Sequence, residues 1–151
     1  MDQPVLFSDE LSEPEAEIYC DGASSGNPGQ SGIGVLIRFR KNSPALPDIR
    51  ISESIGITTN NVAEYSAFIR ALKEAASAGL RRIEIYLDSE LIVKQIKGVY
   101  KVRSANLRPL WEEALKMLKK FDSYKLAHVR RDLNMEADLL AKGAVKNAGK
   151  S

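Results

Sequence analysis

Four carboxylates stand where the sequence changes from one kind of pattern to another. Asp21 and Asp88 each end a strand-like run. Glu64 lies in the expected first turn of a helix, and Asp138 lies about one turn into the last expected helix. If the two strands are neighbours in a sheet, their terminal carboxylates lie side by side. The four residues are therefore candidates for one shared site.

Such a site would hold metal ions. Clustered carboxylates repel one another and raise one another's pKa unless cations neutralise them. Cys20 is the only cysteine and His128 the only histidine, which leaves oxygen as the main ligand type. Oxygen ligands in this number suit Mg²⁺ or Mn²⁺. Two such ions roughly 3.5 to 4 Å apart can activate a water and stabilise the departing oxygen in phosphodiester hydrolysis.

Each carboxylate also has an ordinary structural explanation. The alternatives, in chain order, are a turn signal at Asp21 and Gly22, a capping box of Asn61 with Glu64, a helix start at Asp88, and an ion pair of Asp138 with Lys142. The metal-site interpretation therefore depends on whether the fold brings the four together.

The first half of the chain predicts three antiparallel strands. We expect them at residues 17–23, 32–40 and 49–57, with residues 41–48 connecting the second to the third. The third strand is indicated by isoleucines at period two, namely Ile49, Ile51, Ile55 and Ile57. Short turns between consecutive strands imply antiparallel pairing.

Helical and strand patterns then alternate. The expected elements are a helix from residues 58–61 to Gly79, a strand at 83–87, short and longer helices at 89–97 and 106–120, a strand at 124–129, and a helix from Asn134. This succession predicts an α/β fold, in which three antiparallel strands and then two parallel strands form a mixed five-stranded sheet flanked by helices.

Composition favours one compact domain. The chain has 151 residues and 44% hydrophobic content, enough for a sizeable core. It has neither an apolar run of about 18 residues nor a signal-peptide pattern, so we expect a cytoplasmic protein without a membrane span. We assign residues 1–16 to an acidic tail, 17–147 to the domain and 148–151 to a short tail.

The charge is unevenly distributed. Residues 1–17 hold six acids and no Lys or Arg, and the rest of the chain holds 22 basic and 14 acidic residues, a net charge of +8. A basic body of this kind favours a polyanionic partner.

Four short segments contain the candidate carboxylates in order: residues 19–29 (YCDGASSGNPG), 58–65 (TTNNVAEY), 87–91 (LDSEL) and 134–141 (NMEADLLA). Together they resemble the ribonuclease H type 1 family, over about residues 17–143. The resemblance implies an endoribonuclease that cuts the RNA strand of an RNA/DNA hybrid and leaves 5′-phosphate and 3′-hydroxyl ends. It also implies two Mg²⁺ ions, with Mn²⁺ as a possible substitute.

The same resemblance assigns roles to residues of these segments. Asp21, Glu64, Asp88 and Asp138 would be the catalytic, metal-binding carboxylates. Asp21 would bridge both ions, Asp138 would lie on the side of the attacking water, and Glu64 and Asp88 would lie towards the leaving group. Five residues match family positions near the substrate, namely Gly22, Ser24, Asn27, Asn60 and Ser89.

Thr59 and Asn61 would lie towards the phosphates of the DNA strand. Only RNA offers a 2′-hydroxyl, so small residues and backbone groups can distinguish the two strands. Turn and cap chemistry is the alternative for these substrate residues, and we expect it to hold for Asn61 as well.

The segment before the last helix departs from the family pattern. Many members place a histidine there, whereas this chain has VRRDL at residues 129–133 and His128 ahead of it. We interpret His128 as a structural residue at the end of a strand. Arg131 could take over part of the catalytic role by stabilising phosphate charge, with a solvated surface arginine as the alternative.

A basic segment at residues 91–111 contains no acid. Its cations are Lys94, Lys97, Lys101, Arg103 and Arg108, and it includes Tyr100 and Trp111. Such a run can track phosphates and stack on sugars, or it can be a solvated helix face and linker. We expect Lys101 and Arg103 to contact phosphate and Trp111 to lie in the core.

The sequence thus predicts a monomeric, metal-dependent endoribonuclease for RNA/DNA hybrids. One alternative is a related nuclease that also acts on double-stranded RNA. Another is a non-catalytic nucleic-acid-binding module, against which the intact carboxylate set argues, because a pure binder gains nothing from acids that face phosphates.

Overall fold

The structure is a computed structural model that describes residues 13–40 and 46–148. Most of the expected acidic tail, residues 1–12, therefore lies outside the described residues, as do residues 41–45 of the expected connection and 149–151 of the expected short tail. The elements are β1 (Ala16–Ser24), β2 (Gly29–Phe39), β3 (Ile49–Thr58), α2 (Asn60–Ser77), β4 (Arg82–Leu87), α3 (Glu90–Ile96), α4 (Arg108–Leu118), β5 (Ser123–His128), the 3-10 helix η1 (Arg131–Asn134) and α5 (Met135–Ala148).

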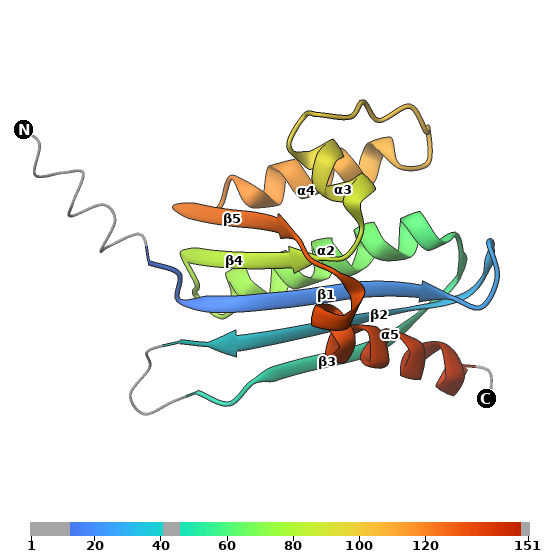
Figure 1. The fold of residues 1–151 in the computed structure, drawn as a ribbon, viewed down its shortest axis with the longest axis horizontal. Coiled ribbons are helices and arrows are strands. Elements are labelled where there is room, and N and C mark those ends of the chain that lie inside the picture. The colour runs from blue at the N-terminus through green and yellow to red at the C-terminus, as the bar shows by residue number, and fades with distance from the viewer. Residues whose placement is uncertain (1–12, 41–45, 149–151) are drawn as a thin grey trace, which may run out of the picture.

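The five strands form one mixed sheet in the order β3-β2-β1-β4-β5 (Figure 1). β1 pairs antiparallel with β2, and β2 with β3, whereas β1 and β4, and β4 and β5, pair in parallel. The predicted fold class is therefore confirmed. β1 is the central strand and has an antiparallel neighbour on one side and a parallel neighbour on the other.

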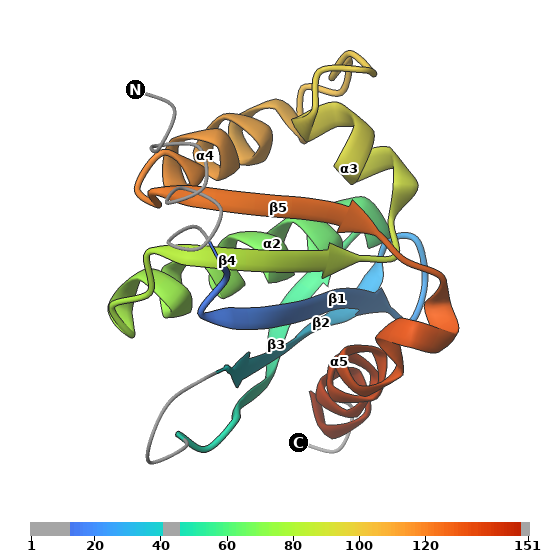
Figure 2. The ribbon, with the colours of Figure 1, turned by 60° about the vertical axis from the view of Figure 1, so that its left-hand side comes forward.

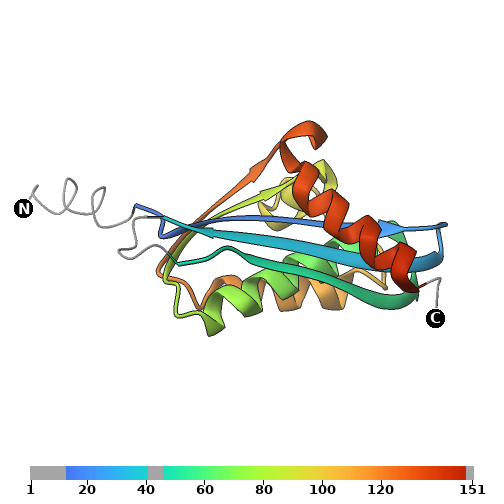
Figure 3. The same ribbon diagram turned by 90° about the horizontal axis from the view of Figure 1, so that it is seen from below.

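Helices cover both faces of the sheet. α2 lies on one face and α5 on the other, as the view from below shows (Figure 3). Alternate residues of β1 and β4, among them Ile18 and Ile85, are buried in a core that α2 completes with Tyr65, Phe68 and Leu72. α5 lies across β2, β3 and β1 near the carboxyl end of β1 (Figure 2).

Glycines in β2 let α5 approach the sheet closely. A Cβ atom on Gly34 would lie 2.2 Å from the carbonyl oxygen of Ala137, and one on Gly32 would lie 2.7 Å from that of Ala141. The residues of α5 that are buried in this contact are small as well, namely Ala137, Ala141 and Ala144. This small-residue contact fixes how far α5, and with it Asp138, lies from β1.

The prediction for the third strand is wrong at Ile57. Ser31 pairs with Gly56 but Gly32 pairs with Ser54, so Ile55 is an extra residue in β3. This bulge reverses the alternation of side chains beyond it. Ile57 is therefore 71% exposed instead of sharing the buried side with the earlier isoleucines.

The start of β1 is tied to β4. The side chain of Glu15 accepts hydrogen bonds from the backbone N–H groups of Arg81 and Arg82, at 2.7 and 3.0 Å.

Across the ranges 13–40 and 46–148, none of the helices combines the length and hydropathy required to cross a bilayer.

Candidate active site

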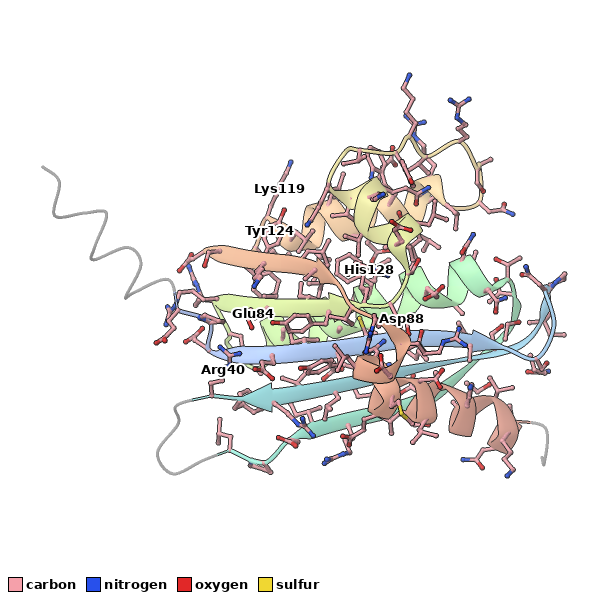
Figure 4. All side chains as sticks on the ribbon, in the orientation of Figure 1. Arg40, Glu84, Asp88, Lys119, Tyr124 and His128 are labelled. Atoms are coloured by element: carbon pink, nitrogen blue, oxygen red, sulfur yellow. The ribbon has the colours of Figure 1, made fainter. Side chains whose placement is uncertain are left out.

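The register of β1 and β4 places Asp21 beside Asp88. Tyr19 is opposite Tyr86 in this parallel pair, and their rings stack on one face of the sheet at 5.1 Å between centroids. Each aspartate follows its tyrosine by two residues and, because side chains alternate, belongs to the same face. The expected adjacency of the two carboxylates is therefore present. Figure 4 shows Asp88 at the end of β4, beside the start of α5.

Glu64 reaches the same place because α2 begins very close to β1. The carbonyl carbon of Ala63 lies 2.2 Å from the position that a Cβ atom on Gly22 would occupy. Glu64 is the fifth residue of α2, two residues further into the helix than the expected capping box would place it. One carboxylate oxygen from each of Asp21, Glu64 and Asp88 lies within 4.8 Å of the others.

Asp138 borders this cluster from α5. Its Oδ2 pairs with Lys142 Nζ at 3.1 Å, so the ordinary ion pair suggested by the sequence is present. Asp138 nevertheless lines the same hollow of about 420 Å³ as the three clustered carboxylates. The fold thus brings all four predicted acids to one site, with Asp138 held at its margin by a lysine.

Burial, together with crowding by neighbouring acids, raises the pKa of two of these carboxylates. Burial, the charge of Asp88, and the hydrogen bonding and charge of neighbouring acids raise the pKa of Asp21 to about 9. Burial and the charge of Asp88 raise the pKa of Glu64 to about 7, although Asp21 and Arg131 act in the opposite direction. A site in which ionised carboxylates are this unfavourable is one that a divalent cation would stabilise.

The donor set also fits such a cation chemically. Asp21 is buried, and Glu64 and Asp88 are partly buried, so three oxygen donors from β1, α2 and the end of β4 converge at a place partly shielded from solvent. Carboxylate oxygens are the preferred ligands of Mg²⁺ and Mn²⁺.

Four of the predicted substrate residues line the hollow. They are Gly22, Ser24, Asn60 and Asn61, and Arg131 of η1 lies there with them. Ser24 Oγ also donates to the carbonyl of Thr58 at 3.2 Å, which joins the end of β1 to the end of β3. Arg131 lies in a 3-10 turn that leads directly into α5.

Other predicted residues shape the start of the helices. Asn27 Oδ1 accepts the backbone N–H of Asn60 at 3.0 Å, and Ser89 caps α3 by accepting from Ile92 N–H at 3.2 Å. Thr59, with its side chain accepting from Val62 N–H, is the cap of α2. The expectation that Asn61 has a capping role is therefore wrong, because the helix begins two residues earlier.

His128 ends β5 with an exposed side chain, in keeping with its interpretation as a strand-end residue (Figure 4). Lys101 and Arg103 are exposed and line a second hollow of about 580 Å³ together with Tyr100, Arg108 and Trp111. Trp111 only partly matches the core prediction. It packs against the core and its Nε1 donates to the carbonyl of Gln95 at 3.1 Å, but it also forms a wall of this hollow.

Sequence reasoning missed the part that Asn134 plays at the site. It was expected only to start the last helix, yet its side chain is 1% exposed and donates hydrogen bonds to Asp88 Oδ2 and to the carbonyl of Cys20. Lys142 was likewise known only as an ion-pair partner. The sequence signals for Asn134 are its place one turn before Asp138 and its position as the first residue of the segment 134–141 that resembles the family.

Comparisons with known proteins identify the family of the chain. The family described as "Reverse transcriptase-like" matches residues 19–144. A ribonuclease H from Pelobacter propionicus is 33% identical over 158 residues, which cover 95% of this chain and 93% of that protein. The chain belongs to the ribonuclease H type 1 family. A ribonuclease HI from Halobacterium salinarum is 38% identical over 130 residues, or 86% of this chain and 64% of that protein.

Solved ribonuclease H structures share the fold. The RNase H1 of Halobacterium salinarum superposes with a TM-score of 0.80 at 36% identity, covering 87% of this chain and 98% of that one. LC11-RNase H1, solved in complex with an RNA/DNA hybrid, gives a TM-score of 0.78 at 38% identity over 88% and 98% of the two chains. This chain spans less than two thirds of the Halobacterium protein's full length.

Proposed function

We propose that this chain is an endoribonuclease that hydrolyses the RNA strand of RNA/DNA hybrids. The observation that carries the proposal is the convergence of Asp21, Glu64 and Asp88 within 4.8 Å, in a member of the ribonuclease H type 1 family. We further propose that residues 17–147 act as one domain, in a monomer. We propose a cytoplasmic location as well.

The site residues have distinct proposed roles. Two Mg²⁺ ions, or Mn²⁺ in their place, would supply an activated water and stabilisation of the departing oxygen, which leaves 5′-phosphate and 3′-hydroxyl ends. Asp21, the most buried acid, would hold both ions, with Glu64 and Asp88 on the leaving-group side. Asp138, which borders the cluster, would orient the attacking water. Arg131 adds a positive charge at the hollow that can stabilise phosphate.

The substrate assignment rests on the groups that surround these acids. Gly22, Ser24 and Asn60 offer backbone and small polar groups beside the carboxylates, where the 2′-hydroxyl of an RNA strand can be read. Asn27 and Ser89 would lie near the same RNA strand. Thr59 and Asn61 would lie towards the phosphates of the DNA strand. The hybrid bound to LC11-RNase H1, a relative at 38% identity, supports this choice.

A cleavage assay tests the proposal directly. Purified protein is incubated with end-labelled RNA/DNA hybrid, duplex RNA and duplex DNA, in Mg²⁺, in Mn²⁺ and with chelator. We expect metal-dependent cutting of the RNA strand of the hybrid, and none in the matched variant Asp88→Asn. Cutting of duplex RNA alone would overturn the substrate assignment but keep the metal site, whereas hybrid binding without any cleavage would favour a non-catalytic binding module.

The basic residues of the second hollow should contribute affinity rather than chemistry. Lys101 and Arg103 are exposed, lie beside Tyr100 and Trp111, and can neutralise phosphates of a bound strand. We expect the double substitution Lys101→Ala and Arg103→Ala to weaken hybrid binding and to reduce the salt slope of log Kd by about one to two units.

Fluorescence anisotropy at several salt concentrations measures this slope. Lys119→Ala with Lys120→Ala is the matched control, since it removes the same charge from exposed positions after α4. If the Lys101 and Arg103 substitutions left the slope unchanged, neither residue would contact phosphate, and both would be ordinary solvated surface residues.

A further inference from the structure

Asn134 joins three of the four carboxylate-bearing elements. Its Nδ2 donates to the carbonyl oxygen of Cys20 in β1 at 3.0 Å and to Asp88 Oδ2, directly after β4, at 3.3 Å. The residue itself ends η1 and leads into α5, one turn before Asp138. A single buried amide is therefore bonded to the residue before Asp21, to Asp88 itself and, through the chain, to α5.

The orientation of this amide is fixed by its partners. Both contacts of Nδ2 are to oxygen acceptors, so the reverse orientation would point Oδ1 at two oxygens and lose both hydrogen bonds. Oδ1 is buried and has no hydrogen-bond partner within residues 13–40 and 46–148. An unpartnered buried oxygen costs about 1 to 3 kcal/mol, so the two donated bonds hold the side chain despite that cost.

We propose that Asn134 is a positioning residue that holds Asp88 and the Asp21 end of β1 in the geometry needed for metal binding. Asp88 lies just beyond the last residue of β4, where the paired strand no longer restrains it, and the Asn134 amide supplies a restraint there. Groups that hydrogen-bond to metal-binding side chains in this way set the affinity of a site. The role deepens the proposed nuclease function and rests on it.

Three substitutions separate this role from simple packing. Asn134→Ala removes both donors, and Asn134→Asp keeps the shape but turns an acceptor toward two oxygens. Asn134→Ser keeps one short donor. The matched control is Asn147→Asp, the same chemical change at an exposed position of α5. Circular dichroism melting identifies the temperature at which each full-length variant is folded.

The principal readout is Mg²⁺ and Mn²⁺ affinity, measured by isothermal titration calorimetry on folded protein without substrate. We expect Asn134→Ala to weaken Mg²⁺ binding by about 10- to 100-fold, Asn134→Asp to weaken it further, and Asn147→Asp to leave it unchanged. In cleavage assays the Asn134→Ala variant should recover activity as Mg²⁺ is raised, with the KM for the hybrid unchanged.

Unaltered metal affinity in a folded Asn134→Ala variant would overturn the proposal, even if its melting temperature fell. A second measurement needs no substitution: the Asn134 side-chain amide signals of the wild-type protein should shift early in a Mg²⁺ titration followed by NMR, and their failure to shift would also overturn it. Because neither measurement uses cleavage, a wild-type protein that bound metal but cut no hybrid would contradict the nuclease function alone.

Discussion

Asp21→Asn should abolish cleavage and at the same time stabilise the metal-free protein. Cleavage should fall by about 10³-fold or more, because an amide oxygen binds a divalent cation far more weakly than a carboxylate and metal ions contribute several kcal/mol of transition-state stabilisation. Asp21 is 6% exposed and central to the three-carboxylate cluster, so neither Glu64 nor Asp88 can take its place.

The gain in stability follows from the raised pKa of Asp21. Burial and its acidic neighbours raise this pKa from 3.8 in the unfolded chain to about 9. The stabilising contribution of the protonated group is complete below about pH 4 and is lost as pH rises towards 9. The Asn variant does not titrate there, so its melting temperature should exceed that of wild type by an increasing margin between pH 5 and pH 8, reaching about 5 °C.

Melting curves in chelator and in Mg²⁺ test this reasoning. Mg²⁺ should raise the melting temperature of wild type and leave that of the variant unchanged. Asp122→Asn is the control, because Asp122 is exposed and its ion pair with Arg81, 2.7 Å away, lowers its pKa. Its removal should lower stability at neutral pH, which is the opposite sign. Wild-type cleavage, or equal pH dependence of melting, in Asp21→Asn would show that the metal site lies elsewhere.

The sequence could predict which acids meet because strand ends are visible in its pattern. Period-two runs end at Asp21 and Asp88, and a mixed sheet puts the carboxyl ends of parallel strands at one edge. The exact pairing was not visible, since the register depends on how Tyr19 and Tyr86 pack across the sheet. Element types therefore followed from local pattern, whereas distances needed the tertiary fold.

The errors arise where the sequence pattern leaves a shift of one or two residues undetermined. The extra residue Ile55 in β3 turns Ile57 to the outside, and no pattern before it announces a bulge. Thr59 and Asn61 are both good helix-capping residues, and only the backbone determines that α2 begins after Thr59. Asn134 escaped notice for a related reason, because a side-chain amide at a helix start usually bonds to its own backbone.

Gly22 has two possible roles, contact with the substrate and close packing of α2 against β1. The substitution Gly22→Ala should distinguish them. The sequence placed it near the substrate. In the structure, a Cβ atom there would lie 2.2 Å from the carbonyl carbon of Ala63 and 2.5 Å from the backbone nitrogen of Glu64. Both contacts are to helix backbone, so no side chain can rotate away, and the first turn of α2 must move.

We therefore expect Gly22→Ala to lower the free energy of unfolding by about 1 to 3 kcal/mol and to weaken Mg²⁺ binding, since the displaced turn carries Glu64 out of the cluster. Gly143→Ala is the matched control, because a Cβ atom at that helical position meets only the Ser52 hydroxyl oxygen at 3.8 Å. It should leave metal binding unchanged and raise the free energy of unfolding by up to about 1 kcal/mol.

Denaturant unfolding and calorimetric Mg²⁺ titration, both done below the melting temperature of the variant, distinguish the two explanations. Loss of stability together with metal affinity would identify Gly22 as the residue that seats α2 against β1. A Gly22→Ala protein with wild-type stability and metal affinity but a raised KM for the hybrid would contradict that, and would leave contact with the RNA strand as the role of Gly22. The outcome decides whether the position of Glu64 depends on the absence of a Cβ atom at Gly22.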